Sequence, residues 1–200
     1  MTKGPDPDVG PWRIGTSSDL SGQVGSRRLY TGRVISLDVD SVRFPNGTTG
    51  DLEMIRHSGA SAVLPFLNDP DRDDAEVLLI RQYRYATGGY ILEIPAGRLD
   101  PGELPLACAS RELKEETGYT AEHLDPLMTI FTTPGFTDER IHLFMARGLA
   151  RGDANLETDE ILDPVSMRFH QALQMVESGE ICDGKTVIAL LFAATFRQRR

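Results

Sequence analysis

The sequence lacks the features that mark disulfide-rich, zinc-binding, membrane-spanning or secreted proteins. Its 200 residues include only two cysteines, Cys108 and Cys182, too few for a disulfide framework, and no Cys/His cluster spaced for zinc. No apolar run reaches the roughly 18 residues of a membrane span, and the proline-broken N-terminus lacks a secretory signal. We therefore expect a cytoplasmic protein in a reducing compartment, without a membrane segment.

Positive charge is also in deficit. Twenty-one Lys and Arg residues stand against thirty Asp and Glu, which gives a net charge of −9. This surplus repels polyanions and argues against nonspecific binding to nucleic acid or anionic membranes, so a phosphate-bearing ligand needs a local cation. Hydrophobic residues make up 40% and charged residues 26%, the usage of an ordinary globular protein of one core domain.

The N-terminal part divides into a tail and a β extension. Residues 1–26 are rich in Gly, Pro, Ser and Asp and predict a flexible tail. Residues 27–58 predict two antiparallel strands, because apolar and polar residues alternate between Tyr30 and Phe44 before a Pro-Asn-Gly turn. Such a pair cannot enclose a core alone, so it must pack on the rest of the chain or on a second subunit.

Residues 59–200 alternate between short apolar runs and helical patterns. Five strands are predicted, at 60–67, 75–83, 90–94, 127–132 and 140–150, and three helices, at about 104–117, 168–178 and 186–197. Gly118 is placed to end the first helix in the left-handed conformation. The pattern predicts an α+β fold, layered as an α/β/α sandwich with the N-terminal antiparallel strands as an extension.

The first of these helices carries three carboxylates on one face. Glu112, Glu115 and Glu116 lie within roughly a third of a turn of one another at 100° per residue. Like charges three and four residues apart destabilise a helix, and anions in its last turn oppose the helix dipole. A helix face that breaks two local rules suggests a missing counter-charge, and clustered carboxylates suit Mg²⁺, with Mn²⁺ possible.

The residues around this helix resemble the Nudix box. Gly97 is followed after five residues by Glu103, and after seven more by Arg111-Glu112-Leu113-Lys114-Glu115-Glu116-Thr117-Gly118-Tyr119. Every charged and glycine position of the box is present, and Tyr119 is the one soft departure. The resemblance implies a Nudix-type fold and hydrolysis of a nucleoside diphosphate linked to another moiety, with Mg²⁺ as cofactor.

The same resemblance implies roles for individual residues. The metal ligands would be Glu112, Glu116 and the backbone carbonyl of Ala96, with Glu115 as a third carboxylate ligand or a neighbour of the ligands. Arg111 would orient the carboxylates. The general base would come from the acidic loop before Ile161, where Glu160 is our choice, and a solvated acidic loop is the alternative.

Further residues are similar to those of the ADP-ribose pyrophosphatase subgroup. Pro134 stands sixteen residues after Gly118, and Arg84 precedes the box as a plausible phosphate contact. Glu139 occupies the position that contacts the terminal ribose in that subgroup. The resemblance implies a hydrolase that cleaves ADP-ribose to AMP and ribose 5-phosphate, and a homodimer formed through the N-terminal strands.

Three alternatives stay open. Leu52 stands before Glu53 where the subgroup carries an arginine, so Glu53 could contact the base of a different substrate, and a GDP-sugar of the GDP-mannose type is one candidate. A Nudix regulator that binds a nucleotide sugar without cleaving it is another, although all three box carboxylates are retained. Residues 179–186 also match the letters of a P-loop, but a predicted helix rather than a strand precedes them.

Overall fold

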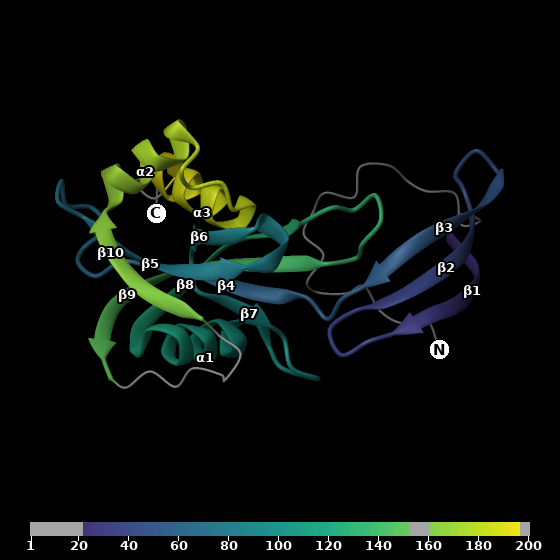
Figure 1. Ribbon diagram of the computed structural model, residues 1–200, viewed down its shortest axis with the longest axis horizontal. Helices are drawn as coiled ribbons and strands as arrows, with labels where there is room; N and C mark the ends of the chain where they lie inside the picture. Colours follow the sequence, from purple (N-terminus) through teal and green to yellow (C-terminus); the bar gives the residue numbers. More distant parts are fainter. Residues whose placement is uncertain (1–21, 153–160, 197–200) are drawn as a thin grey trace. The chain divides into compact units, whose positions relative to one another are not determined.

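The computed structural model describes residues 22–152 and 161–196 of the chain. It divides into two compact units, Met1–Arg56 and His57–Arg200 (Figure 1).

The first unit is a three-stranded antiparallel sheet. Its strands are β1 (Gly22–Thr31), β2 (Ser36–Arg43) and β3 (Thr49–Arg56), in the order β1-β2-β3. The single strand that we expected from Tyr30 to Phe44 is divided by a turn in which the Gly32 N–H donates to the Ile35 carbonyl at 2.9 Å. β1 begins at Gly22, inside the stretch that we predicted to be a flexible tail. The prediction failed there because the polar residues of this strand carry no alternating signal; they pair with β2 through the backbone and through side-chain bonds to Asp38 and Asp40.

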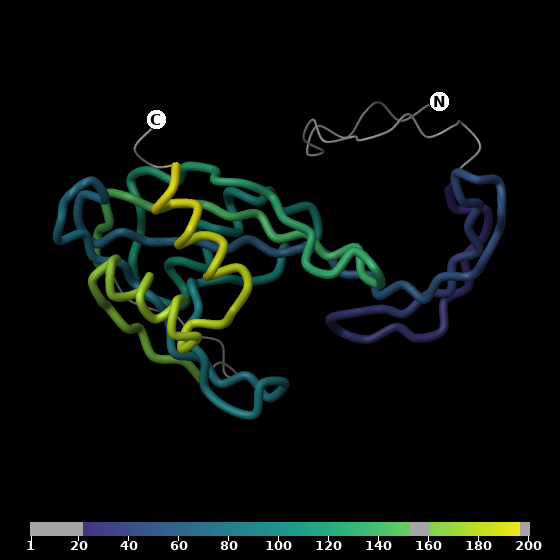
Figure 2. The backbone as a smooth tube through the Cα atoms, turned by 90° about the horizontal axis from the view of Figure 1, so that it is seen from above, coloured from purple at the N-terminus to yellow at the C-terminus, as the bar shows by residue number. Residues whose placement is uncertain are grey.

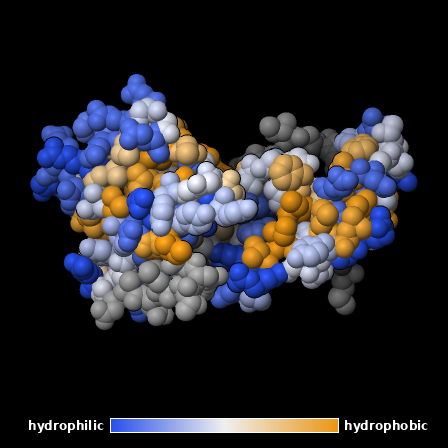
Figure 3. All heavy atoms as spheres, viewed as in Figure 1, coloured by the Kyte–Doolittle hydropathy of each residue, from blue (hydrophilic) through white to orange (hydrophobic). Residues whose placement is uncertain are grey.

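Charged side chains line one face of this sheet. Asp38 and Asp40 on β2 are buried, and Arg56 from β3 pairs with both carboxylates. Arg28 from β1 also pairs with Asp38, and cross-strand pairs of opposite charge stabilise the register. The unit still exposes large aliphatic side chains, namely Val24, Leu29, Val34, Ile35 and Leu52. Hydrophobic surface, drawn in orange, is visible on this unit in Figure 3.

The second unit holds two sheets. A four-stranded mixed sheet has the order β7-β4-β9-β8, with β4 parallel to β9, and a three-stranded antiparallel sheet has the order β10-β5-β6. The strands are β4 (Ala60–Pro65), β5 (Glu76–Arg84), β6 (Gly89–Glu93), β7 (Ala96–Arg98), β8 (Tyr119–Phe131), β9 (Arg140–Arg151) and β10 (Leu162–Arg168).

Three α-helices of the described residues complete the layers. They are α1 (Pro105–Thr117), α2 (Phe169–Ser178) and α3 (Gly184–Phe196), and a 3-10 turn, η1 (Tyr85–Thr87), joins β5 to β6. α1 covers one side of the sheets and α2 and α3 the other (Figure 1), and α2 lies beside α3 (Figure 2). None of the helices in residues 22–152 and 161–196 is long and apolar enough to cross a membrane.

The buried side chains form two clusters that match these layers. The larger joins strands β4, β5 and β9 to α2 and α3, with Phe66 and Phe169 in ring contact at 5.2 Å between centroids. The smaller joins Ala109 and Leu113 of α1 to Val63, Phe144 and Ala146 of β4 and β9. The predicted α+β sandwich is thereby confirmed.

Three strands of this unit differ from the prediction, and one of them, the three-residue β7 after Pro95, was not predicted. β8 begins at Tyr119 rather than at Leu127, and its pairing with β9 shifts register between Pro126 and Met128. The first half of this strand was not predicted, because its apolar and polar residues do not alternate without a break. β10 was missed because it lies in a polar stretch that contains Pro164, which fits there because β10 is an edge strand.

Candidate active site

The acidic face of α1 is turned toward the protein rather than toward solvent. Glu112 and Glu116 are buried, with 7% and 1% of their surface exposed. The helix that carries them starts with Pro105 at its first turn, where a missing N–H costs nothing, and ends where Gly118 adopts a left-handed φ of +74°. A simply solvated acidic face is therefore excluded for these two carboxylates.

Both buried carboxylates converge on the backbone of β7. The Ala96 N–H donates to Glu116 Oε2 at 2.9 Å. The Glu112 carboxylate lies over Gly97, so closely that a Cβ at residue 97 would stand 1.9 Å from Glu112 Oε1. The glycine at this position of the sequence thus has a physical reason, because only a residue without a side chain leaves room for the carboxylate.

The guanidinium of Arg111 binds three carboxylates, those of Glu112, Glu115 and Glu103. Its Nη1 donates to Glu112 Oε1 at 2.6 Å and to Glu115 Oε2 at 2.9 Å. Its Nε and Nη2 donate to the two oxygens of Glu103, both at 2.9 Å. The bonds to Glu103 and the charge of Glu112 raise the pKa of Arg111 far above its ordinary value. The pKa of Glu103 falls to about 2, chiefly through its hydrogen bond from Arg111.

The donor set of this face fits a hard divalent cation. Glu112, Glu115, Glu116 and the carbonyl of Ala96 offer only oxygen, the ligand that Mg²⁺ prefers. Glu112 and Glu115 both pair with the Arg111 guanidinium, so two carboxylates of this face share one positive charge. No group of three acidic, His or Cys side chains in the described ranges is arranged as a metal cluster.

Cys108 lies behind the same face but is not a nucleophile. It is fully buried, and its Sγ lies 3.5 Å from the Gly97 carbonyl. Burial first, and then the charges of Glu112 and Glu103, raise the pKa of its thiol to about 12. The thiol therefore stays protonated at neutral pH.

A second charged cluster centres on Glu93, a residue that our reading of the sequence did not single out. Glu93 ends β6 with 1% of its side chain exposed. Arg84 binds it with two bonds, Nε to Oε1 at 2.7 Å and Nη2 to Oε2 at 2.9 Å. Lys185 also donates to Oε2. Although burial opposes ionisation, these two cations hold the pKa of Glu93 below its ordinary value.

Lys185 belongs to residues 179–186, which match the sequence pattern of a P-loop. In the structure these residues do not form a P-loop; they lead from the end of α2 into the start of α3. The preceding element is α2, which Gly179 ends, so no strand leads into the motif. Asp183 caps α3 by accepting from the Thr186 N–H at 3.0 Å and from its hydroxyl at 2.6 Å. The P-loop alternative is thereby rejected.

The remaining predicted site residues are spread over several elements. Glu139 accepts from the Thr132 hydroxyl at 2.9 Å and lies 3.4 Å from Nδ1 of His57. Pro134 is exposed in the loop between β8 and β9. Glu53 lies exposed on β3 of the first unit, opposite Val39. Glu160, our choice of general base, lies outside the described residues.

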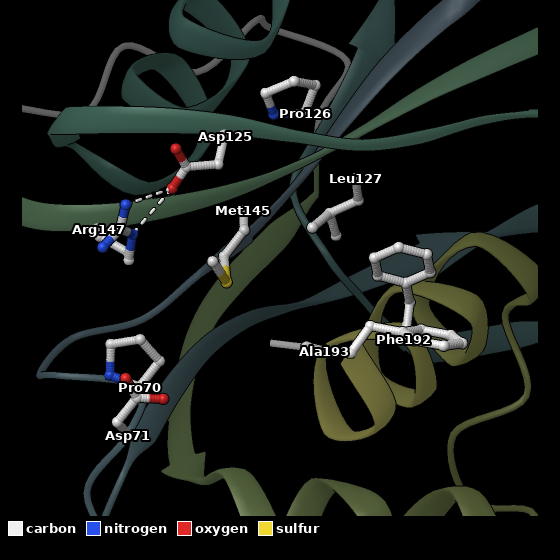
Figure 4. A pocket seen from close by; sticks show the side chains of 10 residues that line it. Pro70, Asp71, Asp125, Pro126, Leu127, Met145, Arg147, Phe192 and Ala193 are labelled. Atoms are coloured by element: carbon white, nitrogen blue, oxygen red, sulfur yellow. Dashed lines mark hydrogen bonds and ion pairs between the residues drawn. The ribbon is translucent and has the colours of Figure 1, made fainter. Parts of the chain in front are cut away.

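A cavity of about 200 Å³ is lined by none of the predicted site residues (Figure 4). Its lining comes from β8, β9, α3 and the loop after β4, and includes no residue of α1. On its rim Arg147 binds Asp125 at 2.7 and 2.8 Å, and Phe192 and Met145 supply apolar walls. It is smaller than the pockets that usually hold nucleotides.

The chain is similar to known proteins over most of its length. The model of the NUDIX domain family matches residues 57–187. A methanol dehydrogenase activator of Bacillus methanolicus is 41% identical over 84% of this chain and 90% of its own. An ADP-ribose pyrophosphatase of Bacillus subtilis is 37% identical over the same shares.

Two further matches extend the comparison. A GDP-mannose pyrophosphatase of Klebsiella pneumoniae is 37% identical over 74% of this chain and 80% of its own. Among solved structures, an ADP compounds hydrolase superposes with a TM-score of 0.75, covering 92% of this chain and 97% of the other at 24% identity. At that identity the superposition supports the fold alone.

Proposed function

The chain belongs to the NUDIX domain family, and we propose on this premise that it hydrolyses the diphosphate of ADP-ribose or a similar nucleoside diphosphate sugar. Water would attack one phosphorus and the bridging P–O bond would break, which yields AMP and ribose 5-phosphate from ADP-ribose. The observation that carries the proposal is the convergence of Glu112 and Glu116 on the Ala96–Gly97 backbone. Two buried carboxylates beside a strand end are expensive for stability, which favours a role in chemistry.

Mg²⁺ is the proposed cofactor. Glu112, Glu116 and the Ala96 carbonyl would hold it, with Glu115 as a further carboxylate ligand. When bound, the metal would lower the pKa of a water ligand and offset the charge of the diphosphate. The negative net charge of the protein would otherwise repel this substrate.

The chain's own residues would do the remaining work. Arg111 would keep Glu112 and Glu115 in fixed orientations through its Nη1 donors. Arg84 would donate to a phosphate oxygen, because 41% of its side chain is exposed although two of its donors are bound by Glu93. We propose Glu160 as the general base, since carboxylates engaged with a metal are poorly placed to accept a proton as well.

Recognition of the two ends of the substrate is assigned to three residues. Glu139 would accept from the hydroxyls of the terminal ribose, and Pro134 would shape the loop that carries it. Glu53 would accept from an amino group of the base. The leucine at residue 52 leaves base preference open, so a GDP-sugar is the second candidate, which the GDP-mannose pyrophosphatase relative supports.

We further propose a homodimer built on the first unit. In its described residues, 22–56, the first unit is a three-stranded sheet without a helix, which has too little core to be stable alone, and it exposes Val24, Leu29 and Ile35 among its apolar side chains. A second copy of the chain would cover them. Light scattering at micromolar concentration should give twice the chain mass, and a monomer mass would reject this.

We assign the protein to the cytoplasm, because Cys108 and Cys182 are free thiols.

One assay tests the proposed activity. The protein is incubated with Mg²⁺ and a panel of ADP-ribose, GDP-mannose, NADH, diadenosine polyphosphates and dNTPs, and the products are identified. We expect AMP and ribose 5-phosphate from ADP-ribose, and no turnover when EDTA replaces the metal. Turnover of GDP-mannose alone would favour the second candidate. Absence of turnover with every compound would reject catalysis and favour a regulator, as the name of the Bacillus methanolicus relative suggests.

A further inference from the structure

The Glu93 cluster joins three separate elements of the second unit. Glu93 comes from the end of β6, Arg84 from the end of β5, and Lys185 from the first turn of α3. Lys185 also lies 3.1 Å from Asp183 Oδ2, the oxygen that caps α3. The cluster therefore contains two carboxylates and two cations, and its formal charge is zero.

Hydrogen bonds through Thr186 connect the Glu93 cluster to the backbone just before Ala96 and Gly97, where the Nudix box begins. The Ile94 N–H, next to Glu93, donates to the Thr186 hydroxyl at 2.9 Å, and that hydroxyl donates in turn to Asp183. Thr186 is fully buried, so this link is shielded from water. The start of α3 is thereby fixed against the strand end that leads to Ala96.

The two cations differ in what they can offer a ligand. Lys185 is 11% exposed, and both of its carboxylate partners lie within the protein. Arg84 is 41% exposed, and Glu93 engages only its Nε and Nη2 edge. A guanidinium has five N–H donors, so three remain for a ligand and their direction is fixed by the bidentate pair.

We infer that Lys185 is a positioning residue, which acts through Glu93 to hold the Arg84 guanidinium in the direction that receives a substrate phosphate. A carboxylate buried like Glu93 stays ionised only when cations balance it. Lys185 supplies one of these charges and, through its bond to Oε2, keeps the Glu93 carboxylate in the orientation in which its two oxygens hold the Nε and Nη2 edge of Arg84. Without Lys185 the carboxylate can turn, and the Arg84 guanidinium loses its fixed direction. The catalytic part of this inference rests on the proposed function, whereas the fixed orientation of Arg84 does not.

The test compares Lys185→Met with Lys185→Arg and Glu93→Gln in the full-length protein. With ADP-ribose and Mg²⁺, we expect Lys185→Met to raise KM about tenfold or more with little change in kcat, because a charge-assisted hydrogen bond made equally in ground and transition states is weakened. Lys185→Arg should restore most of the loss. In the Glu93→Gln background, Lys185→Met should have no further effect.

A measurement without substrate keeps this inference separate from the proposed activity. The Arg84 Nε–H signal in the ¹⁵N–¹H spectrum, assigned by its absence in Arg84→Lys, should exchange slowly in the wild type and rapidly in Lys185→Met. Arg147→Met, which breaks an exposed arginine–carboxylate pair at the cavity of Figure 4, is the matched control and should change neither readout. If Lys185→Met does not fold, Lys185→Gln keeps a donor for Glu93 and should shift both readouts less, in the same direction.

Three results would overturn the inference. One is a folded Lys185 variant, Met or Gln, with wild-type KM and wild-type Nε–H exchange. Another is a Lys185→Met effect that persists in full in the Glu93→Gln background, because Lys185 would then act on the substrate itself. The third is a wild-type Arg84 Nε–H that already exchanges rapidly. A wild type that turns over no compound, yet shows slow Nε–H exchange lost in Lys185→Met, would reject the proposed function and leave the orientation of Arg84 supported.

Discussion

Gly97→Ala is the sharpest test of the carboxylate arrangement. The added Cβ would stand 1.9 Å from Oε1, 2.0 Å from Cδ and 2.3 Å from Oε2 of Glu112, whereas ordinary contact begins near 3.4 Å. The carboxylate must therefore withdraw by about 1.5 Å, the difference between these values. A misplacement of about 1 Å at a reacting centre costs about a hundredfold in rate, so we expect kcat/KM to fall by at least that factor.

Stability should change little in the same variant. Gly97 does not have a positive φ, so alanine fits its backbone conformation. The atoms in the way are the far end of a flexible side chain, which can rotate without moving the helix. Gly→Ala also reduces the entropy of the unfolded chain by about 0.4–1 kcal/mol at compatible sites. We expect Tm to stay within a few degrees of the wild type, where 1 kcal/mol corresponds to about 2–4 °C.

The assay measures kcat/KM with ADP-ribose, the Mg²⁺ concentration for half-maximal activity, and Tm by calorimetry. Gly89→Ala is the matched control, because no atom lies within 4 Å of its added Cβ and its φ is not positive. Full activity in Gly97→Ala would refute the assignment of Glu112 to the site. A large fall in Tm with a parallel loss of activity would show that the glycine serves folding instead.

Three further predictions follow from the site and its surroundings. Glu160→Gln should lower kcat by about 10²- to 10⁴-fold, as expected for loss of a general base, and near-wild-type kcat beside an inactive Glu116→Gln would reject Glu160. Arg111→Lys should lower Tm by about 5 °C and reduce kcat, because a point charge cannot replace the guanidinium fork, and unchanged Tm would count against its bridging role. The pKa of Glu103 is lowered from 4.5 to about 2, so its ionised form stabilises the fold above pH 4.5 and this contribution is lost as pH falls toward 2. Between pH 5 and 3, Tm should therefore fall more in the wild type than in Glu103→Gln, and equal slopes would contradict this.

Local rules predicted much of the fold. Alternating or continuous apolar runs located β4, β5, β6 and β9, and the Pro105 and Gly118 signals bounded α1. They failed for β1, for the three-residue strand β7, for the first half of β8 and for β10, where the residues of the strand carry no unbroken alternation of apolar side chains. These strands are held by pairing with another strand, which for β10 is β5, remote in sequence.

By itself the sequence determined the carboxylate face of α1 and the glycine before it, because helical spacing fixes which residues share a face and the box fixes their order. Only the tertiary structure decided what those carboxylates contact: Glu116 meets the Ala96 N–H, and the space beside Gly97 is filled by Glu112. It also decided what Lys185 contacts, which is the carboxylate of Glu93, although its local motif matches a phosphate loop. The reason is that a buried charge is stable only beside its counter-charge, and Glu93 lies 92 residues away along the chain.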